Sequence, residues 1–178
     1  MHSALWIWTL FIGLALLVWL SRLVRLLRAV RELPPLTPHM YAQWSEPLPT
    51  VSFLVAAKEE AANIESCLRS LVSQDYPALE IIAINDRSAD DTGRIIDRLA
   101  HETGRITPVH VQSLTPGWLG KNNAMRQGIE RATGQWLCFT DADCIYNCPR
   151  ALRIAMIHAL VQRVDFLSVL PSHEARSF

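Results

Sequence analysis

Cysteine is scarce in this sequence, and neither sign of charge is in excess. The 178 residues include 4 cysteines at irregular spacings, which argues against a disulfide framework and favours a reducing compartment. Lys and Arg together number 17, as do Asp and Glu. Four arginines, at positions 22, 25, 28 and 31, lie in one short stretch, so the rest of the chain has 13 basic (17 − 4) and 17 acidic residues. A mildly acidic domain is poorly suited to wrapping nucleic acid, and no nucleic-acid partner is predicted.

Charged residues are missing altogether from residues 4–20, which are rich in Leu, Ile, Val and Trp. With the apolar positions up to residue 27 they form a segment of about 20 residues, roughly the length of helix that crosses a bilayer core. A cleaved signal peptide would have a basic start, a shorter apolar core and a small-x-small cleavage site, and none of these is present. We therefore predict that the chain contacts the membrane through a spanning helix at residues 4–27.

Positive charge follows the apolar segment and is absent before it. The positive-inside rule then places the N-terminus outside and everything after Arg22 in the cytoplasm, so the predicted location is the cell (inner) membrane. The arginine stems can lie along the headgroups while their charges meet anionic lipid. Prolines at 34, 35, 38, 47 and 49 prevent the helix from continuing. The predicted organisation is a membrane helix with a basic flank over residues 1–32, a proline-rich linker over 33–49 and a globular domain over 50–178.

Short apolar runs and amphipathic helical patterns alternate along this domain, without an internal repeat or a low-complexity segment. The β-branched runs predict buried strands, and the 3.6-residue periodicity predicts the helices between them. The predicted strands are residues 51–56, 80–84, 107–111, 135–140 and 165–169. Strands separated by helices of this size indicate an α/β fold, a mostly parallel sheet covered by helices on both faces.

Polar residues collect where three of the predicted strands end. Residues 57–60 follow the first strand, residues 85–88 follow the second, and Asp141-Ala142-Asp143 follows the fourth. Ligands bind beyond the carboxyl ends of the strands in such sheets, so these groups are expected to share one rim. Two carboxylates one residue apart can hold a divalent cation, Mg²⁺ or Mn²⁺, against a diphosphate.

The ordered set of motifs resembles the family 2 glycosyltransferases, enzymes of the Rossmann-like GT-A fold that use nucleotide-sugar donors. The likeness covers roughly residues 50–170. It rests on these segments: Val55-Ala56-Ala57-Lys58-Glu59-Glu60 with Asn63-Ile64, Ser73-Gln74-Asp75-Tyr76-Pro77, Glu80 to Ser88, Gly120-Lys121-Asn122-Asn123-Ala124, Gly134-Gln135-Trp136 and Phe139-Thr140-Asp141-Ala142-Asp143.

The resemblance implies a role for each matching site residue. It assigns Asp143 to the metal and Asp141 to the metal and the donor ribose. It places Asp86 against the nucleoside, Ala57 and Glu59 in the same donor pocket, and Lys121 on the diphosphate. The chain departs from the family at Lys58, where the family usually has Asn, so the role of this lysine is left open.

Simpler roles are available for the same residues. The Asp141–Asp143 pair could be a polar turn that caps the next helix, and Asp86 could be a turn residue paired with Arg87. Glu59 and Glu60 suit the first turn of a helix. Other polar groups are given no ligand role: Asp90 and Asp91 are interpreted as helix caps, Cys138, Cys144 and Cys148 as buried or idle thiols, and the scattered histidines form no ligand set.

The predicted activity is the metal-assisted, inverting transfer of a sugar from a nucleotide-diphosphate sugar, expected to be a UDP-sugar, to a lipid or other membrane-associated acceptor. Inverting members of the family need an acidic general base, which is expected beyond Phe178, with the acceptor half missing from this chain. The arrangement looks most like bacterial enzymes associated with hopanoid biosynthesis. The alternative is a degenerate fragment or a non-catalytic nucleotide-sugar binder. A phosphatase of the haloacid-dehalogenase type is disfavoured, because its Asp-x-Asp lies on the first strand.

Overall fold

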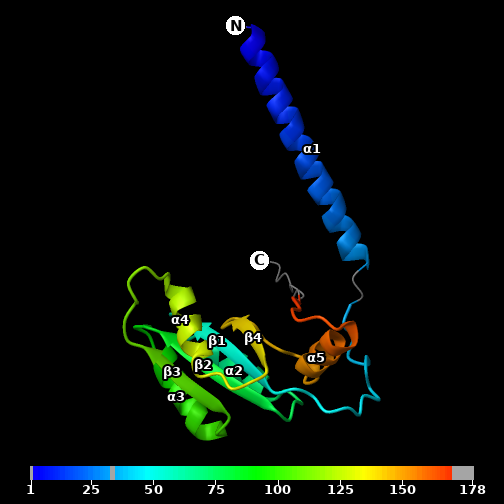
Figure 1. Ribbon diagram of the computed structural model, residues 1–178. Helices are drawn as coiled ribbons and strands as arrows, with labels where there is room; N and C mark the ends of the chain where they lie inside the picture. Colours follow the sequence, from blue (N-terminus) through cyan, green and yellow to red (C-terminus); the bar gives the residue numbers. More distant parts are fainter. Residues whose placement is uncertain (1, 33–34, 170–178) are drawn as a thin grey trace. The chain divides into compact units, whose positions relative to one another are not determined.

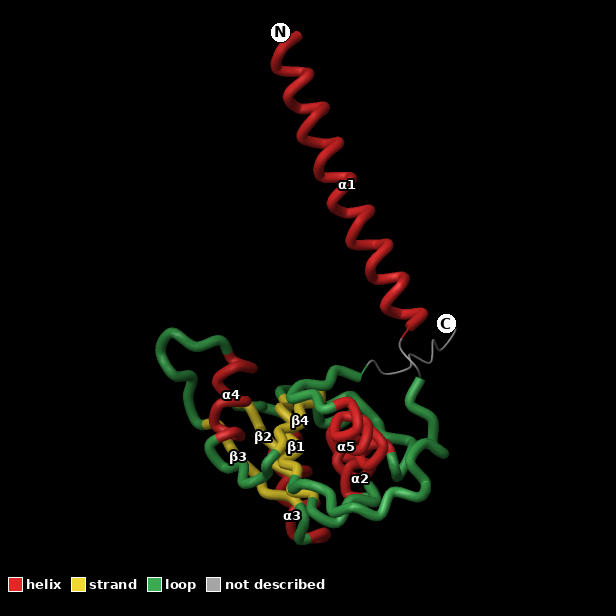
Figure 2. The backbone as a smooth tube through the Cα atoms, turned by 45° about the vertical axis from the view of Figure 1, so that its right-hand side comes forward, coloured by secondary structure: helices red, strands yellow, loops and turns green. Residues whose placement is uncertain are grey.

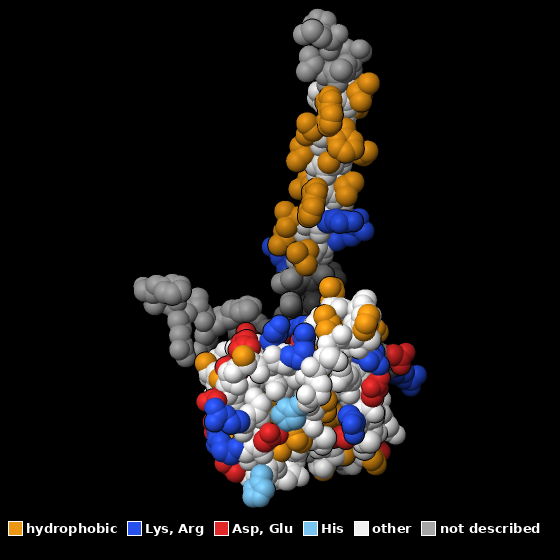
Figure 3. Space-filling model, turned by 90° about the vertical axis from the view of Figure 1, so that its left-hand side faces the viewer, with side chains coloured by type: hydrophobic (Ala, Val, Ile, Leu, Met, Phe, Trp, Pro, Cys, Tyr) orange, Lys and Arg blue, Asp and Glu red, His pale blue; other side chains and the backbone are white. Residues whose placement is uncertain are grey.

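The computed structural model describes residues 2–32 and 35–169, and the chain divides into two compact units, residues 1–36 and 37–178. The first unit consists of one helix, α1 (His2–Glu32). Its segment Trp6–Arg28 is 23 residues long, has no side chain buried in protein, and is long and apolar enough to cross a membrane. Apolar side chains surround this helix, and basic side chains appear near its C-terminal end (Figure 3). The helix overlaps the span predicted at residues 4–27.

The predicted linker lies partly outside the described residues, which resume at residue 35. From there to residue 50 the chain forms turns and irregular structure, as its prolines require. Residues 37–50 belong to the second unit and are hydrogen-bonded to the rest of it. The Tyr41 hydroxyl hydrogen-bonds to Nδ1 of His158 at 2.8 Å, and the Tyr76 hydroxyl donates to the Pro49 carbonyl at 2.6 Å.

The second unit is built on a four-stranded sheet in the order β3-β2-β1-β4. All neighbouring strands are parallel, as predicted. The strands are β1 (Val51–Ala57), β2 (Leu79–Asp86), β3 (Ile106–Val111) and β4 (Trp136–Asp141). The helices are α2 (Ile64–Val72), α3 (Thr92–Thr103), α4 (Gly120–Ile129) and α5 (Ala151–Gln162).

Alternate residues of the central strands face two separate apolar layers. Val51, Phe53 and Val55 of β1 pack in one cluster with buried side chains of α2, α3 and α5. Leu54 packs in a second cluster with Ala124 of α4. Figures 1 and 2 show the corresponding arrangement, with α4 on one side of the sheet and α2 and α5 on the other. Helices therefore cover both faces, which explains why the central strands are largely apolar.

One motif of the family resemblance has a structural role. Gln74 is 3% exposed, and its side-chain amide donates to the carbonyls of Ser70 and Cys148 at 3.3 and 3.0 Å. Its Oε1 accepts from the backbone N–H of Leu152 at 3.1 Å. The next residue, Asp75, donates its backbone N–H to the Pro149 carbonyl at 2.7 Å. Residues 74 and 75 therefore connect the end of α2 to the start of α5.

The prediction of a strand at residues 165–169 is wrong. These residues form neither a strand nor a helix, and Phe166 and Val169 are 82% and 54% exposed. A strand needs a neighbour to satisfy its backbone hydrogen bonds. The four strands in the described part of the chain form one sheet in which this segment has no place. The last residues of the predicted globular domain, 170–178, lie outside the described residues.

Candidate functional site

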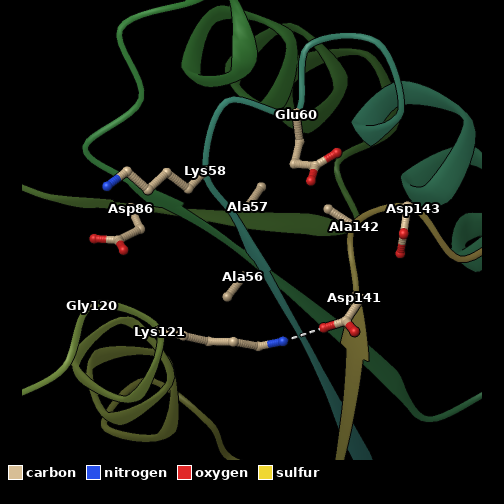
Figure 4. A pocket seen from close by; sticks show the side chains of 10 residues that line it. All are labelled: Ala56, Ala57, Lys58, Glu60, Asp86, Gly120, Lys121, Asp141, Ala142 and Asp143. Atoms are coloured by element: carbon tan, nitrogen blue, oxygen red, sulfur yellow. Dashed lines mark hydrogen bonds and ion pairs between the residues drawn. The ribbon is translucent and has the colours of Figure 1, made fainter.

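A cleft of about 450 Å³ opens at the carboxyl ends of the strands. The strand order reverses beside β1, because β2 and β3 follow on one side and β4 lies on the other. Such a reversal separates the connecting loops of a parallel sheet and leaves a crevice for ligands. Figure 4 shows the lining side chains, which are those of Ala56, Ala57, Lys58, Glu60, Asp86, Gly120, Lys121, Asp141, Ala142 and Asp143. The predicted common rim is confirmed for Asp86, Asp141 and Asp143.

Asp86 ends β2 and is the most buried carboxylate of the cleft, at 4% exposure. Its Oδ1 accepts a hydrogen bond from Nε of Arg87 at 2.8 Å, so the pairing considered as an alternative is present. Its Oδ2 faces Gly120, where a Cβ atom would lie 3.1 Å away. The glycine at the start of α4 therefore lets this helix end approach the carboxylate. Asp86 is paired and still lines the cleft, so the two interpretations are compatible.

Lys121 and Asp141 form an ion pair at the mouth of the cleft (Figure 4). Lys121 lies in the first turn of α4 and Asp141 ends β4. Both side chains are more than half exposed, at 61% and 60%. Asp143 is exposed on the following turn, and its Oδ1 has a contact with Sγ of Cys144 at 3.8 Å. The two carboxylates of the Asp-x-Asp motif thus keep oxygens open to solvent.

Ala57 lines the cleft as predicted. The two glutamates that follow Lys58 differ in position. Glu60 is among the lining residues, whereas Glu59 is not. The Glu59 carboxylate accepts the backbone N–H of Ala89 at 2.8 Å, and its own N–H donates to Oγ of Ser88 at 3.1 Å. Glu59 therefore ties the loop after β1 to the loop after β2, and its predicted place in the donor pocket stays a prediction.

Asp90 strengthens the same junction. Its Oδ1 accepts from the backbone N–H of Thr92 at 3.0 Å, and its Oδ2 accepts from the N–H of Ala61 at 3.0 Å. The Thr92 hydroxyl also donates to Oδ1 of Asp90. This bond is the largest cause that lowers the pKa of the Asp90 carboxyl, and the two backbone bonds lower the pKa further. The residue caps the start of α3 and holds the loop before α2, in agreement with its interpretation as a cap. Asp91 occupies the N-cap position of α3 as predicted, but its side chain makes no capping hydrogen bond and forms an ion pair with Arg94.

Two residues beside the cleft have backbone angles that side-chain-bearing residues rarely adopt. Glu59 has φ 56° and Arg87 has φ 55°, both in the left-handed region. Each follows closely on the end of a central strand. Such conformations cost roughly 1–3 kcal/mol each and cluster at functional sites, where the surrounding structure enforces them. Here the hydrogen bonds of Glu59 and the ion pair of Arg87 with Asp86 supply that support.

The donor set at the Asp-x-Asp turn suits a hard divalent cation. Among the described residues no three His, Cys, Asp or Glu side chains are grouped closely enough to enclose a metal ion. Mg²⁺, however, is commonly bound by one or two carboxylates together with phosphate oxygens and water. Asp141 and Asp143, both open to solvent, fit that arrangement.

The cysteines fit a metal site less well. All four are free thiols, and burial raises the pKa of Cys67 and Cys138 to about 12. Only a thiolate is a good metal ligand, and these two groups stay protonated at neutral pH. The ring of Trp118, in the loop before α4, packs under the guanidinium of Arg126 at 5.3 Å and is not one of the lining residues.

The fold and the cleft define a class: a parallel α/β domain with a carboxylate-lined ligand site at the reversal of its strand order. The comparison with protein families goes one step further. The family model of glycosyl transferase family 2 matches residues 52–155, which is more than half of the chain. The chain therefore belongs to glycosyl transferase family 2.

Relatives match more than half of the chain. The poly-beta-1,6-N-acetyl-D-glucosamine synthase of Staphylococcus epidermidis is 34% identical over 98 residues, covering 54% of this chain and 22% of the relative. The 4,4'-diaponeurosporenoate glycosyltransferase of Staphylococcus aureus is 30% identical over 135 residues, covering 72% of this chain and 33% of the relative. The chain thus spans about a fifth to a third of the length of these relatives.

Solved structures share the fold. The mannosyltransferase PcManGT from Pyrobaculum calidifontis, in complex with GDP-Man and Mn²⁺, aligns with a TM-score of 0.61 at 27% identity, covering 81% of this chain and 41% of that one. TarS of Staphylococcus aureus (residues 1–349), in complex with UDP-GlcNAc, aligns with a TM-score of 0.54 at 21% identity, covering 71% and 38%. The predicted GT-A fold is confirmed.

Proposed function

We propose that this chain binds a nucleotide-diphosphate sugar and carries the donor site of a glycosyltransferase. The observation that supports it best is the convergence of Asp86, Lys121, Asp141 and Asp143 on one cleft. Membership of glycosyl transferase family 2 supports the same reaction class. The proposed donor is a UDP-sugar. Because a structural neighbour was solved with GDP-Man, a GDP-sugar is the other donor to compare with it in binding assays.

The proposed roles follow the positions of the side chains. Asp86, buried at the end of β2, accepts a hydrogen bond from the nucleoside, with Ala57 and Glu59 bordering that part of the site. Lys121, at the start of α4, binds the diphosphate together with the free N–H groups of the helix. Asp141 and Asp143 would hold Mg²⁺ or Mn²⁺. When bound, the cation neutralises negative charge on the departing nucleoside diphosphate.

The acceptor is proposed to be a lipid or another membrane-associated molecule. Helix α1 supports this, because it is long and apolar enough to span a bilayer. We propose that residues 1–32 anchor the chain in the inner membrane with the N-terminus outside. Residues 33–49 connect this anchor to residues 50–178, which belong to the cytoplasmic donor domain. Within the family, the hopanoid-associated subgroup is proposed on the sequence resemblance alone. Assay with a hopanoid-containing lipid extract as acceptor tests it.

Isothermal titration of the full chain in detergent micelles tests donor binding. Titrations with UDP are compared in Mn²⁺ and in a chelator. We expect Mn²⁺ to tighten UDP binding. Asp143→Asn, which deletes a charged ligand, should reduce this Mn²⁺-dependent increase in UDP affinity by a factor of about ten. Asp97→Asn is the matched control, because this exposed carboxylate on α3 bonds to His110 outside the cleft. Equal Mn²⁺ dependence in wild type and Asp143→Asn would refute the metal assignment. Failure of the wild type to bind UDP would refute the proposed donor site.

A further inference from the structure

Lys58 is the residue at which this chain departs from the family pattern, and it lies in the cleft. Lys58 and Lys121 are the only lysines in the sequence, and both are lining residues. Lys121 already has a partner in Asp141. No ion pair of Lys58 is found among the described contacts. Its ammonium is therefore a hydrogen-bond donor available to a ligand.

Lys58 and Asp86 line the same cleft from the ends of two neighbouring strands. In the parallel pair β1–β2 the last residues opposite each other are Ala57 and Asn85, and Lys58 and Asp86 follow directly in the two chain segments. Side chains of a strand alternate between faces. Ile84 packs on the α4 side of the sheet, and Asp86, two positions further along β2, also projects to that side, where its Oδ2 faces Gly120.

The two lysines serve different parts of the cleft. Figure 4 shows Lys58 extending toward the part where Asp86 lies, whereas Lys121 reaches Asp141. The Asp141 part carries both carboxylates of the proposed metal and diphosphate site. The Asp86 part carries one carboxylate, of which Oδ1 is held by Arg87 and Oδ2 faces the cleft beside Gly120. This part of the cleft therefore offers a ligand one acceptor, Oδ2 of Asp86, and one donor, the Lys58 ammonium.

This acceptor and donor complement a base edge on which an N–H group adjoins a carbonyl. Uracil and guanine have such a lactam edge. Cytosine and adenine carry the reverse pattern, with an amino group in place of the carbonyl and a ring nitrogen that accepts. Against those bases, the Asp86 carboxylate would meet a lone pair and the Lys58 ammonium would meet an amino group. Buried donors and acceptors that face their own kind lose the hydrogen bond and keep the desolvation cost.

We infer that Lys58 is a specificity-determining residue of the donor site: its ammonium donates to the carbonyl oxygen of a lactam base while Asp86 accepts the adjacent N–H. The inference rests on the proposed donor function and deepens it. It assigns Lys58 to base selection and leaves the diphosphate to Lys121.

Titration of the full chain in detergent micelles with UDP and with CDP, both in Mn²⁺, tests this role. The two nucleotides have the same ribose and diphosphate and differ at the base edge. We expect wild type to bind UDP at least about tenfold more tightly than CDP, as one charge-assisted hydrogen bond allows. Lys58→Met should weaken UDP binding about tenfold and change CDP binding less than about twofold. Lys58→Arg keeps a cationic donor and should retain most of the preference for UDP.

Arg94→Met is the matched control for the loss of one positive charge, because Arg94 is 84% exposed on α3 and pairs with Asp91 outside the cleft. It should leave both affinities unchanged. If Lys58→Met weakens UDP and CDP equally, Lys58 contacts the diphosphate or ribose and the inference is wrong. If neither affinity changes, Lys58 has no role in binding and the inference is also wrong. Failure of wild type to bind either nucleotide would instead refute the proposed donor function itself.

Discussion

The ammonium of Lys121 and the carboxylate of Asp141 are joined in an ion pair that connects the start of α4 to the end of β4. Both groups are more than half exposed, and exposed pairs of this kind contribute only about 0–1 kcal/mol to stability. Little free energy is therefore lost when either group takes another partner. A diphosphate beside Asp141 would offer Lys121 such a partner.

We expect Lys121→Met to weaken binding of UDP to the full chain about tenfold, because a charge-assisted contact to phosphate is removed. Binding of uridine, which lacks the phosphates, should stay the same. Titration of both ligands in Mn²⁺ measures the difference. Lys121→Arg should recover part of the UDP affinity. A loss that is equal for UDP and uridine would contradict a phosphate contact.

Gly128 is predicted to be indispensable for the close packing of α4 on the sheet. A Cβ atom there would lie 2.6 Å from Cδ1 of Ile84 and 2.9 Å from Cδ2 of Leu54. Helix propensity alone would make Gly128→Ala stabilising by about 1 kcal/mol. Overpacking a buried contact costs roughly 1–3 kcal/mol and should win. Urea unfolding should give a lower free energy of unfolding for Gly128→Ala than for wild type. The exposed control Asn122→Ala should leave the free energy of unfolding close to that of wild type. A more stable Gly128→Ala would show that the helix can shift away from the sheet.

Gln74→Leu should destabilise the domain by about 2 kcal/mol, the order of cost for buried backbone groups left without partners. The substitution removes the acceptor for the Leu152 N–H and the donor to the Cys148 carbonyl. Thermal unfolding followed by circular dichroism measures the effect. Ser73→Ala is the control, because this neighbouring hydroxyl is exposed and bonds only within its own helix turn. Equal melting temperatures for Gln74→Leu and Ser73→Ala would contradict the role of Gln74.

The lowered pKa of Asp90 predicts the sign of one pH dependence. Because folding lowers the pKa of this carboxyl, its ionised form stabilises the folded state above the pKa of the unfolded chain. That contribution declines as pH falls below the ordinary aspartate pKa of about 4 and is lost as pH falls through the lower folded pKa. The melting temperatures of wild type and Asp90→Asn should therefore differ most near pH 7 and converge toward pH 3. A difference that grows on acidification would have the opposite sign and would exclude this account.

Much of the fold and part of the site could be predicted from the sequence. All four strands coincide with short apolar runs in the sequence, and the central strands β1 and β2 are largely apolar because both of their faces are buried. The gathering of Asp86, Asp141 and Asp143 follows from the parallel order, which brings carboxyl ends to one edge. The run at residues 165–169 has the same local pattern but no neighbouring strand, and local pattern does not reveal a missing partner.

The sequence by itself determined the alternation of strands and helices, the apolar N-terminal helix and the polar groups that end the strands, because these depend on the periodicity and chemistry of neighbouring residues. Only the tertiary structure decided which of these groups meet. The parallel pairing of β1 with β2 brings Lys58 and Asp86 into one cleft, and the approach of α4 to β4 pairs Lys121 with Asp141. Glu59 turns to Ala89 while Glu60 lines the cleft. Such contacts join residues that are distant in the chain, and they depend on packing and register.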